Sequence, residues 1–259
     1  DALALTGDCA NAGRLADELL GSENAGERAA AEYLRRAGYE ICALNWREGR
    51  YELDIVARTL LDPGDAIVVE RPTYLAALQS FRLFQAKCDG VPLKANGLDI
   101  ECFEAQIRDN KPRFSYLIPS FQNPSGTCYG PAERQAVAEV LDRYELPLVE
   151  DEPYCELDYD DVPKPPICSL VKKAPWIYQG SFSKVLIPGL RVGYLIAHPV
   201  LMPHLVRLKQ AADLHTNRPG QWLALEYMRS ADKPQRLERL QAFYRERRDA
   251  FAAALDAEF

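Results

Sequence analysis

The sequence predicts an α/β protein in which helices flank a mostly parallel sheet to give three layers. From Thr59 onward, apolar runs of strand length alternate with segments of helical pattern, which is typical of βαβ units. Four polar clusters each follow one of these apolar runs directly, namely Tyr74, Asn123, Asp151 with Tyr154, and Ser181 to Arg191. Because ligands gather at the carboxyl ends of parallel strands, we expect the four clusters to meet at one edge of the sheet.

The composition limits the classes of protein to which the chain can belong. A chain of 259 residues with 47% hydrophobic residues can bury the core of one large domain or two small ones. No apolar run approaches the roughly twenty residues that span a bilayer, and no signal peptide is visible, so we expect a cytoplasmic protein without a membrane partner. The net charge of -7 argues against nucleic acid as a partner.

The cysteines and histidines indicate neither disulfides nor a metal site. Seven cysteines are scattered along the chain without a C-x-x-C pair, as expected for reduced thiols in the cytosol. The three histidines lack metal-ligand spacing. We therefore expect no metal.

The first 58 residues contain a helix and a strand by pattern. Residues 27–36 are rich in helix formers, and Gly38 follows as a C′ glycine. Residues 40–46 have the pattern of a strand. Residues 52–58 are apolar, but their periodicity does not distinguish strand from helix.

Residues 22–58 also carry short motifs, which are Gly26-Glu27-Arg28-Ala29-Ala30, Leu34 to Tyr39, Asn45-Trp46-Arg47 and Glu52 to Arg58. This segment resembles the small YraN-type family of nuclease-fold proteins. The resemblance implies that Glu27 and Asp54 would gather around a divalent ion with an E-x-K strand. The nearby strand candidate, residues 66–72, has no Lys two positions after Glu70, so the nuclease set is incomplete.

The remaining elements follow in order. A buried strand is predicted at 66–69, and the loop 71–74 opens a helix at 75–84. Pro131 suits the start of a helix at 132–144, because its missing N–H has no partner at N1. The other predicted elements are strands at 91–93, 114–119, 146–149, 176–178 and 192–197 and helices at 100–107, 219–229 and 233–255.

The stretch from Gly180 to Arg191 carries the most chemistry. Between two apolar runs it offers Lys184, the hydroxyls of Ser181 and Ser183, and the guanidinium of Arg191. A Lys at a strand end among apolar neighbours is a candidate for Schiff-base chemistry, while Arg and hydroxyls suit a phosphate. Taken alone, these residues fit an ordinary loop with a solvated Lys equally well.

Three motifs in fixed order extend this interpretation: Asn123-Pro124-Ser125-Gly126, Glu150 to Tyr154, and Gly180 to Lys184 followed by Pro188 to Tyr194. With them, residues 59–259 resemble the large domain of class I/II, fold-type I aminotransferases that use pyridoxal phosphate. Kynurenine/2-aminoadipate aminotransferases and the aminotransferase-like halves of GntR-type regulators are the most similar groups. The resemblance implies pyridoxal 5'-phosphate as the cofactor.

The resemblance also implies a role for each matching residue. Lys184 would form the Schiff base and move the α-proton, while Asp151 would hold a proton on the pyridine nitrogen. Asn123 and Tyr154 would hydrogen-bond the ring oxygen, and Tyr74 would stack on the ring. Ser181, Ser183 and Arg191 would hold the phosphate. The catalytic set is thus Lys184, Asp151 and Tyr154.

Parts of the family pattern are not found in this chain. Gly49 to Glu52 occupy the place of the usual phosphate loop, and the chain stops at Phe259, before the small C-terminal domain and its substrate-binding Arg. We therefore divide the chain into an N-terminal segment, residues 1–58, and an incomplete large domain, residues 59–259. The junction near residues 52–58 fits both families, which indicates a fusion or a chimera. Uncovered apolar surface should lead to a homodimer or to marginal stability.

The sequence leaves three functions open. The first is an aminotransferase that moves an amino group between an amino acid and a 2-oxo acid, with turnover impaired by the missing parts. The second is a metal-dependent nuclease-like protein that uses Glu27 and Asp54. The third is a catalytically inactive module that binds pyridoxal phosphate for regulation.

Overall fold

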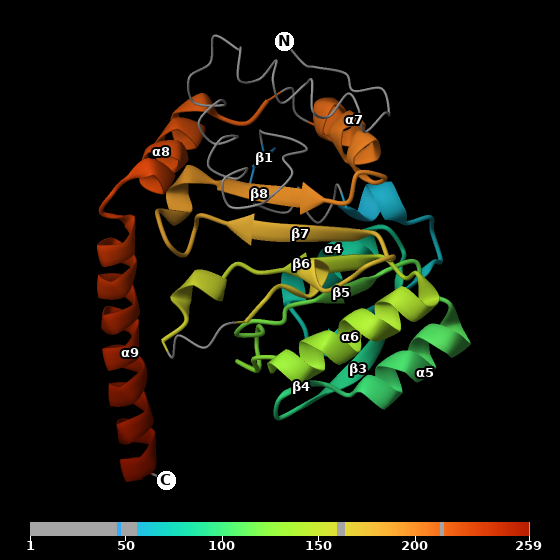
Figure 1. The fold of residues 1–259 in the computed structure, drawn as a ribbon, viewed down its shortest axis with the longest axis horizontal. Helices are drawn as coiled ribbons and strands as arrows, with labels where there is room; N and C mark the ends of the chain where they lie inside the picture. Colours follow the sequence, from blue (N-terminus) through green and yellow to red (C-terminus); the bar gives the residue numbers. More distant parts are fainter. Residues whose placement is uncertain (1–45, 48–55, 160–163, 213–214, 259) are drawn as a thin grey trace.

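Eight strands within the described residues form one sheet, in the order β1-β8-β7-β6-β5-β2-β3-β4 (Figure 1). The computed structural model describes residues 46–47, 56–159, 164–212 and 215–258. The strands are β1 (Trp46–Arg47), β2 (Ala66–Arg71), β3 (Lys87–Lys94), β4 (Gly97–Leu98), β5 (Ser115–Leu117), β6 (Leu148–Asp151), β7 (Trp176–Ser181) and β8 (Val192–Ala197).

The centre of the sheet is parallel and its borders are antiparallel. Strands β3, β2, β5, β6 and β7 run parallel in that order, whereas β8 runs antiparallel to both β7 and β1, and β4 antiparallel to β3. This confirms the predicted mostly parallel α/β sheet. The predicted strand at 146–149 begins later and extends through Asp151, which therefore lies inside β6.

Helices connect these strands at nearly the predicted positions. Pro131 is the first residue of its helix, as predicted. The helices are α4 (Leu75–Leu83), α5 (Ile100–Asn110), α6 (Pro131–Tyr144), α7 (Met202–Ala212), α8 (Arg218–Arg229) and α9 (Lys233–Glu258), with short 3₁₀ turns η1 (Cys155–Leu157), η2 (Ile167–Ser169) and η3 (Pro188–Leu190).

Two hydrophobic cores cover the two faces of the sheet, which makes three layers. On one face, Phe81 of α4 and Leu205 of α7 pack with Ile67 and Tyr116. On the other face, α5 and α6 pack against a second core that includes Val68. Burial on both faces explains why β2 is a continuous apolar run rather than an alternating one.

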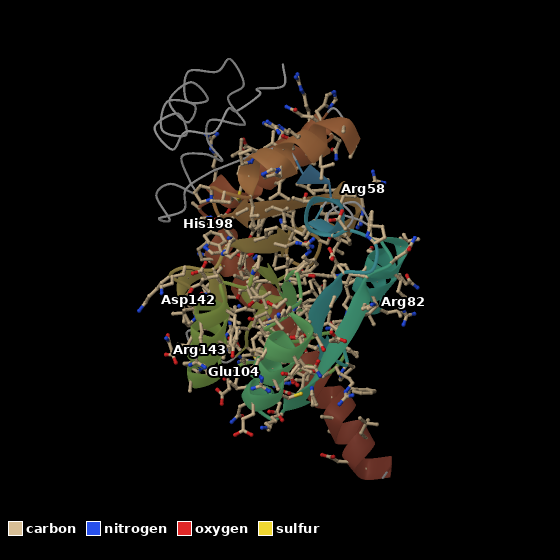
Figure 2. All side chains as sticks on the ribbon, turned by 90° about the vertical axis from the view of Figure 1, so that its right-hand side faces the viewer. Arg58, Arg82, Glu104, Asp142, Arg143 and His198 are labelled. Carbon is tan, nitrogen blue, oxygen red and sulfur yellow. The ribbon has the colours of Figure 1, made fainter. Side chains whose placement is uncertain are left out.

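Surface contacts join neighbouring elements of the fold. Arg143 of α6 pairs with Glu104 of α5, both near the surface (Figure 2). Exposed pairs of this kind contribute little stability. Asp142, next to Arg143, accepts hydrogen bonds from three successive backbone N–H groups, those of residues 172–174, at 2.7 to 3.0 Å. It therefore fixes the turn that leads into β7.

Helix α9 lies along one side of the sheet and extends past it (Figure 1). Lys233 pairs with Glu156 of η1 at 2.6 Å, and Gln241 Nε2 donates to the Glu156 carbonyl at 3.0 Å. Arg245 donates to the Tyr159 carbonyl. The first half of α9 is thus fastened to η1. No helix in the described ranges has the length and apolar character to cross a membrane.

Most of the N-terminal segment lies outside the described residues. This applies to the predicted helix at 27–36, to Glu27 and Asp54, and to Gly49 to Glu52 at the place of the phosphate loop. Trp46 and Arg47 form β1, and residues 56–60 are helical.

Candidate active site

The predicted site residues converge at the carboxyl edge of the parallel strands. Tyr74 follows β2, Asn123 follows β5, and Tyr154 follows β6. Ser181 ends β7, and Ser183 and Lys184 come next. Because β8 runs antiparallel to β7, its first residue lies at the same edge, and Arg191 directly precedes it. All four polar clusters therefore meet where parallel sheets bind ligands.

Lys184 and Tyr154 lie close together at this edge. The Lys184 ammonium is 5.5 Å from the centre of the Tyr154 ring, and its side chain is exposed. Tyr154 precedes η1 with φ -114° and ψ -4°. The turn after β6 therefore brings a phenol to the amine that follows β7.

Asp151 is the buried carboxylate of the site. Its side chain is on the last residue of β6 and is only 5% exposed. Its Oδ2 accepts a hydrogen bond from the Tyr116 hydroxyl at 2.5 Å. Burial, followed by the charge of Asp151, raises the pKa of Tyr116 well above 10, so the phenol keeps its proton and remains the donor.

The loops that carry Tyr74 and Asn123 are fastened together by Gln122. Gln122 Nε2 donates at 2.8 Å both to Glu70 and to the Pro72 carbonyl. Its Oε1 accepts from the Ser125 backbone at 2.9 Å. One buried amide therefore joins the end of β2 to the turn around the cis Asn123-Pro124 bond.

Glu70 holds Gln122 in place and is itself held by further hydrogen bonds. Its Oε1 accepts from the Ile118 N–H at 2.9 Å and from the Tyr129 hydroxyl at 2.8 Å. Burial raises the pKa of Glu70 to about 7, although the hydrogen bonds favour its ionised form. From the sequence, Glu70 is considered only as part of a possible nuclease strand. In the structure, Glu70 instead accepts the hydrogen bonds that support the two loops.

The candidate phosphate residues lie on the turn between β7 and β8. The Ser183 N–H donates to Ser181 Oγ at 3.0 Å, which orients that hydroxyl. Arg191 has φ 52°, in the left-handed region, and its exposed guanidinium donates to the Pro188 carbonyl at 3.3 Å. Asn217 donates to the Leu190 carbonyl at 3.1 Å and so fixes the backbone next to Arg191.

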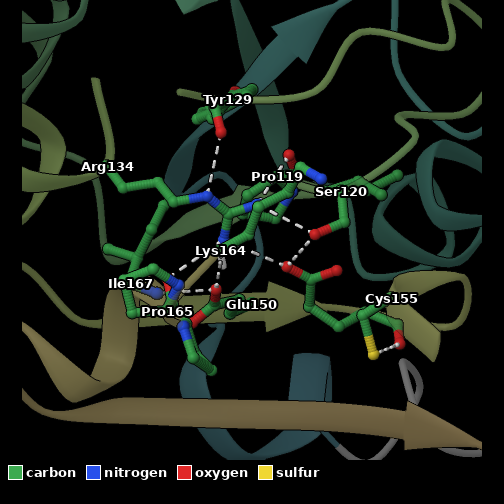
Figure 3. Close-up of polar contacts among 12 residues, drawn as sticks. Pro119, Ser120, Tyr129, Arg134, Glu150, Cys155, Lys164, Pro165 and Ile167 are labelled. Atoms are coloured by element: carbon green, nitrogen blue, oxygen red, sulfur yellow. Dashed lines mark hydrogen bonds and ion pairs between the residues drawn. The ribbon is translucent and has the colours of Figure 1, made fainter. Parts of the chain in front are cut away.

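A buried charged cluster lies on the opposite face of β6 (Figure 3). Arg134 of α6 is fully buried and lies 3.9 Å from Glu150 and 3.5 Å from Glu152. Glu150 accepts from the Ile167 and Cys168 N–H groups, each at 2.8 Å. Burial raises the pKa of Glu152 to about 8. These neighbours of Asp151 therefore join β6 to α6 and η2, while Asp151 faces the other core.

Sequence reasoning missed the residues that support the site. The sequence pattern places Tyr116 in a strand, Gln122 in a turn and Arg134 on a helix surface, and none of these patterns indicates a role in the site. A usable signal was the charged Glu70 at the end of an otherwise apolar strand, because a buried carboxylate requires donors. The Tyr116–Asp151, Gln122–Glu70 and Arg134–Glu152 contacts join residues 35, 52 and 18 positions apart, so only the fold reveals them.

Comparison with known proteins supports the aminotransferase resemblance. The family description for class I and II aminotransferases matches residues 40–259. A 2-aminoadipate transaminase of Thermus thermophilus is 41% identical over 210 residues, 80% of this chain and 52% of the relative. An aromatic-amino-acid aminotransferase of Thermococcus litoralis is 37% identical over 209 residues, 79% of this chain and 50% of the relative. The chain thus spans about half the length of these curated relatives.

A solved structure extends the agreement to the fold. The α-aminoadipate aminotransferase of Thermus thermophilus, complexed with N-(5'-phosphopyridoxyl)-L-leucine, superposes with a TM-score of 0.84 at 34% identity, covering 96% of this chain and 67% of that one. The comparisons do not support the YraN-type resemblance of residues 22–58 or the nuclease alternative. The aminotransferase family match instead includes residues 40–58 of that segment. The chain therefore belongs to the pyridoxal-phosphate-dependent class I and II aminotransferases.

Proposed function

We propose that this chain binds pyridoxal 5'-phosphate at the carboxyl edge of its sheet and provides the catalytic lysine of an aminotransferase. The reaction would move an amino group between an amino acid and a 2-oxo acid. The named activities of the relatives make 2-aminoadipate and aromatic amino acids the first substrates to test.

The side chains at this edge match the groups of the cofactor. An aldehyde requires an amine, which Lys184 offers on an exposed side chain. A pyridine nitrogen requires a buried carboxylate, which Asp151 provides. A phosphate requires hydroxyls and a guanidinium, which the β7–β8 turn carries on Ser181, Ser183 and Arg191. The donor set therefore fits the cofactor.

Each residue has a task that follows from its chemistry. When bound, pyridoxal phosphate supplies an aldehyde that captures amines and a ring that withdraws electrons from the bond to be broken. Lys184 would hold the aldehyde carbon and would move the substrate α-proton as base and acid. Asp151 would keep a proton on the ring nitrogen. Tyr154 and Asn123 would donate to the ring oxygen, and Tyr74 would cover one ring face.

The observation that carries the proposal is the meeting of Lys184, Tyr154 and Asp151 at one strand edge. The amine and the phenol ring are 5.5 Å apart, and the carboxylate is held by a buried tyrosine. Asp151 and Tyr154 lie at the end of β6, whereas Lys184 follows β7, so bringing the amine to the other two residues depends on the parallel pairing of β6 with β7.

The lysine-linked cofactor absorbs in the visible range, which provides the test. Purified protein mixed with pyridoxal phosphate should develop this band, and Lys184→Ala should lose it. Lys172→Ala removes another exposed lysine and should leave the band intact. The same band in Lys184→Ala would refute the proposal.

Turnover is tested separately from binding. Addition of 2-aminoadipate or an aromatic amino acid should convert the band to that of the amine form, and a 2-oxo acid should restore it. A band that forms but does not respond to a broad panel of amino acids would instead indicate the regulatory module.

We also propose that the chain acts in the cytoplasm as a homodimer. The described cysteines are free thiols, which suits a reducing compartment. Helices α8 and α9 expose large apolar side chains, among them Trp222, Phe243 and Phe251. Sedimentation velocity should therefore report about twice the 29.1 kDa chain mass.

A further inference from the structure

Tyr116 is a fully buried tyrosine whose hydroxyl reaches the proposed cofactor carboxylate. It lies on β5 opposite Val149 of β6, and Asp151 is two residues further along β6. Residues two apart on a strand point to the same face, so Tyr116, Val149 and Asp151 share one side of the sheet. The long side chain of Tyr116 thus extends along the neighbouring strand to the carboxylate at its end.

Packing fixes the direction of this side chain. The Tyr116 ring meets Phe81 of α4 edge-on, with 5.4 Å between ring centres and 73° between ring planes. The hydroxyl donates to Asp151 Oδ2 at 2.5 Å. A hydrogen bond to a charged acceptor at this distance is among the stronger ones in proteins. The orientation of the carboxylate is therefore set by a rigid aromatic pair rather than by solvent.

We propose that Tyr116 is a positioning residue that orients the Asp151 carboxylate and lowers its basicity, and so determines how firmly a proton stays on the cofactor ring nitrogen. This inference rests on the proposed binding of pyridoxal phosphate. The titratable groups Glu70 and Tyr74 also act electrostatically on Tyr116, and both further raise its pKa. The phenol is thus a permanent donor, and the Asp151 carboxylate is the acceptor.

Loss of the Tyr116 hydroxyl should have two consequences for the bound cofactor. Asp151 becomes less ordered, which weakens cofactor binding. It also becomes more basic and draws the shared proton from the ring nitrogen. A less positive ring makes the lysine-linked nitrogen more basic, so the pH midpoint of the visible band should rise.

The chain offers a matched control in Tyr129. Both tyrosines are fully buried, and both donate to a carboxylate, Tyr116 to Asp151 at 2.5 Å and Tyr129 to Glu70 at 2.8 Å. Tyr116→Phe and Tyr129→Phe each remove one oxygen and keep the ring, so packing is retained in both. Only Tyr116→Phe removes a donor to the cofactor carboxylate.

The experiment titrates each variant with pyridoxal phosphate and then with pH, following the visible band, and measures stability in urea. We expect Tyr116→Phe to bind the cofactor about tenfold more weakly. We also expect its pH midpoint to rise by roughly half a unit to one unit. Tyr129→Phe should lose a similar amount of stability but keep the pH midpoint of the wild type, because its partner Glu70 supports loops of the site and does not contact the ring nitrogen.

A double-mutant cycle with Asp151→Asn tests whether the effect passes through Asp151. In that background, Tyr116→Phe should change affinity by less than about twofold. Unchanged values in Tyr116→Phe, equal shifts in both phenylalanine variants, or a full effect in the Asp151→Asn background would overturn the inference. If the wild-type protein forms no lysine-dependent band, the proposed function itself fails. If the wild-type band is normal and Tyr116→Phe keeps the wild-type affinity and pH midpoint, only the inference about Tyr116 fails.

Discussion

At the scale of single residues, Gly180 shows how tightly the strand before Lys184 is packed. A Cβ at this position would lie 2.2 Å from Cζ of Tyr194. Tyr194 in turn stacks on Tyr178 and tilts against Phe182, with ring centres 6.3 and 5.6 Å away. The glycine in the Gly-Ser-Phe-Ser-Lys motif is therefore required by the neighbouring ring rather than by backbone conformation.

Gly180→Ala should accordingly destabilise the protein. The Tyr194 ring would have to move within an aromatic cluster, and overpacking of this kind costs about 1 to 3 kcal/mol. Gly189→Ala is the control, because the nearest atom to its added Cβ is 4.0 Å away. Urea unfolding measures both. Equal stability of the two variants would show that the ring moves freely.

At the scale of elements, two helix N-caps allow an effect on stability to be distinguished from an effect on the site. Asn217 caps α8 by accepting from the Gly220 N–H at 2.6 Å, and it also donates to Leu190 beside Arg191. Asp99 caps α5 by accepting from the Cys102 N–H at 3.2 Å, at the other end of the sheet. The two caps resemble each other locally, but only Asn217 is connected to the candidate phosphate turn.

Asn217→Ala and Asp99→Ala should each cost about 1 kcal/mol of unfolding free energy, as capping residues usually do. Only Asn217→Ala should also weaken pyridoxal phosphate binding, because the backbone before Arg191 loses its anchor. Chemical denaturation and cofactor titration of both variants give the comparison. An equal loss of affinity in Asp99→Ala would mean that the effect is merely one of stability.

The elements also show what the sequence could predict. The strand at 192–197 and the start of α6 at Pro131 follow from apolar runs and proline chemistry, which are local signals. The direction of β8 is not local, because an apolar run reads the same in either orientation. Likewise, the Tyr116–Asp151 contact joins residues 35 apart and depends on the register of β5 with β6. The sequence could name the residues that we propose to carry the chemistry, but not the residues that hold them in position.

At the scale of the whole molecule, the cluster around Arg134 joins the sheet to its helical layer. One guanidinium faces both Glu150 and Glu152, and burial raises the pKa of both carboxyls. In the folded protein, the pKa of Glu152 is about 8, above the ordinary value of 4.5. The folded state therefore binds the Glu152 proton more tightly than the unfolded chain does.

This difference predicts how stability depends on pH. The contribution of Glu152 is fully present below about pH 4.5 and is lost as the pH rises through about 8, with Glu70 acting in the same direction up to about 7. Glu152→Gln should reduce the loss of unfolding free energy between pH 4.5 and pH 8, by up to about a few kcal/mol. Glu238→Gln, on an exposed part of α9, serves as the control. Thermal unfolding from pH 5 to 8 measures the slopes, and an undiminished slope in Glu152→Gln would contradict the assignment.

The attachment of α9 to η1 has a mechanical consequence. The helix is about 39 Å long, and Arg245 and Arg248 still contact Tyr159 about halfway along it. The first half of the helix contacts the turn that begins at Tyr154, and the second half exposes apolar side chains such as Phe251. A displacement of α9 would therefore be passed to this turn, and so to the Tyr154 ring beside Lys184.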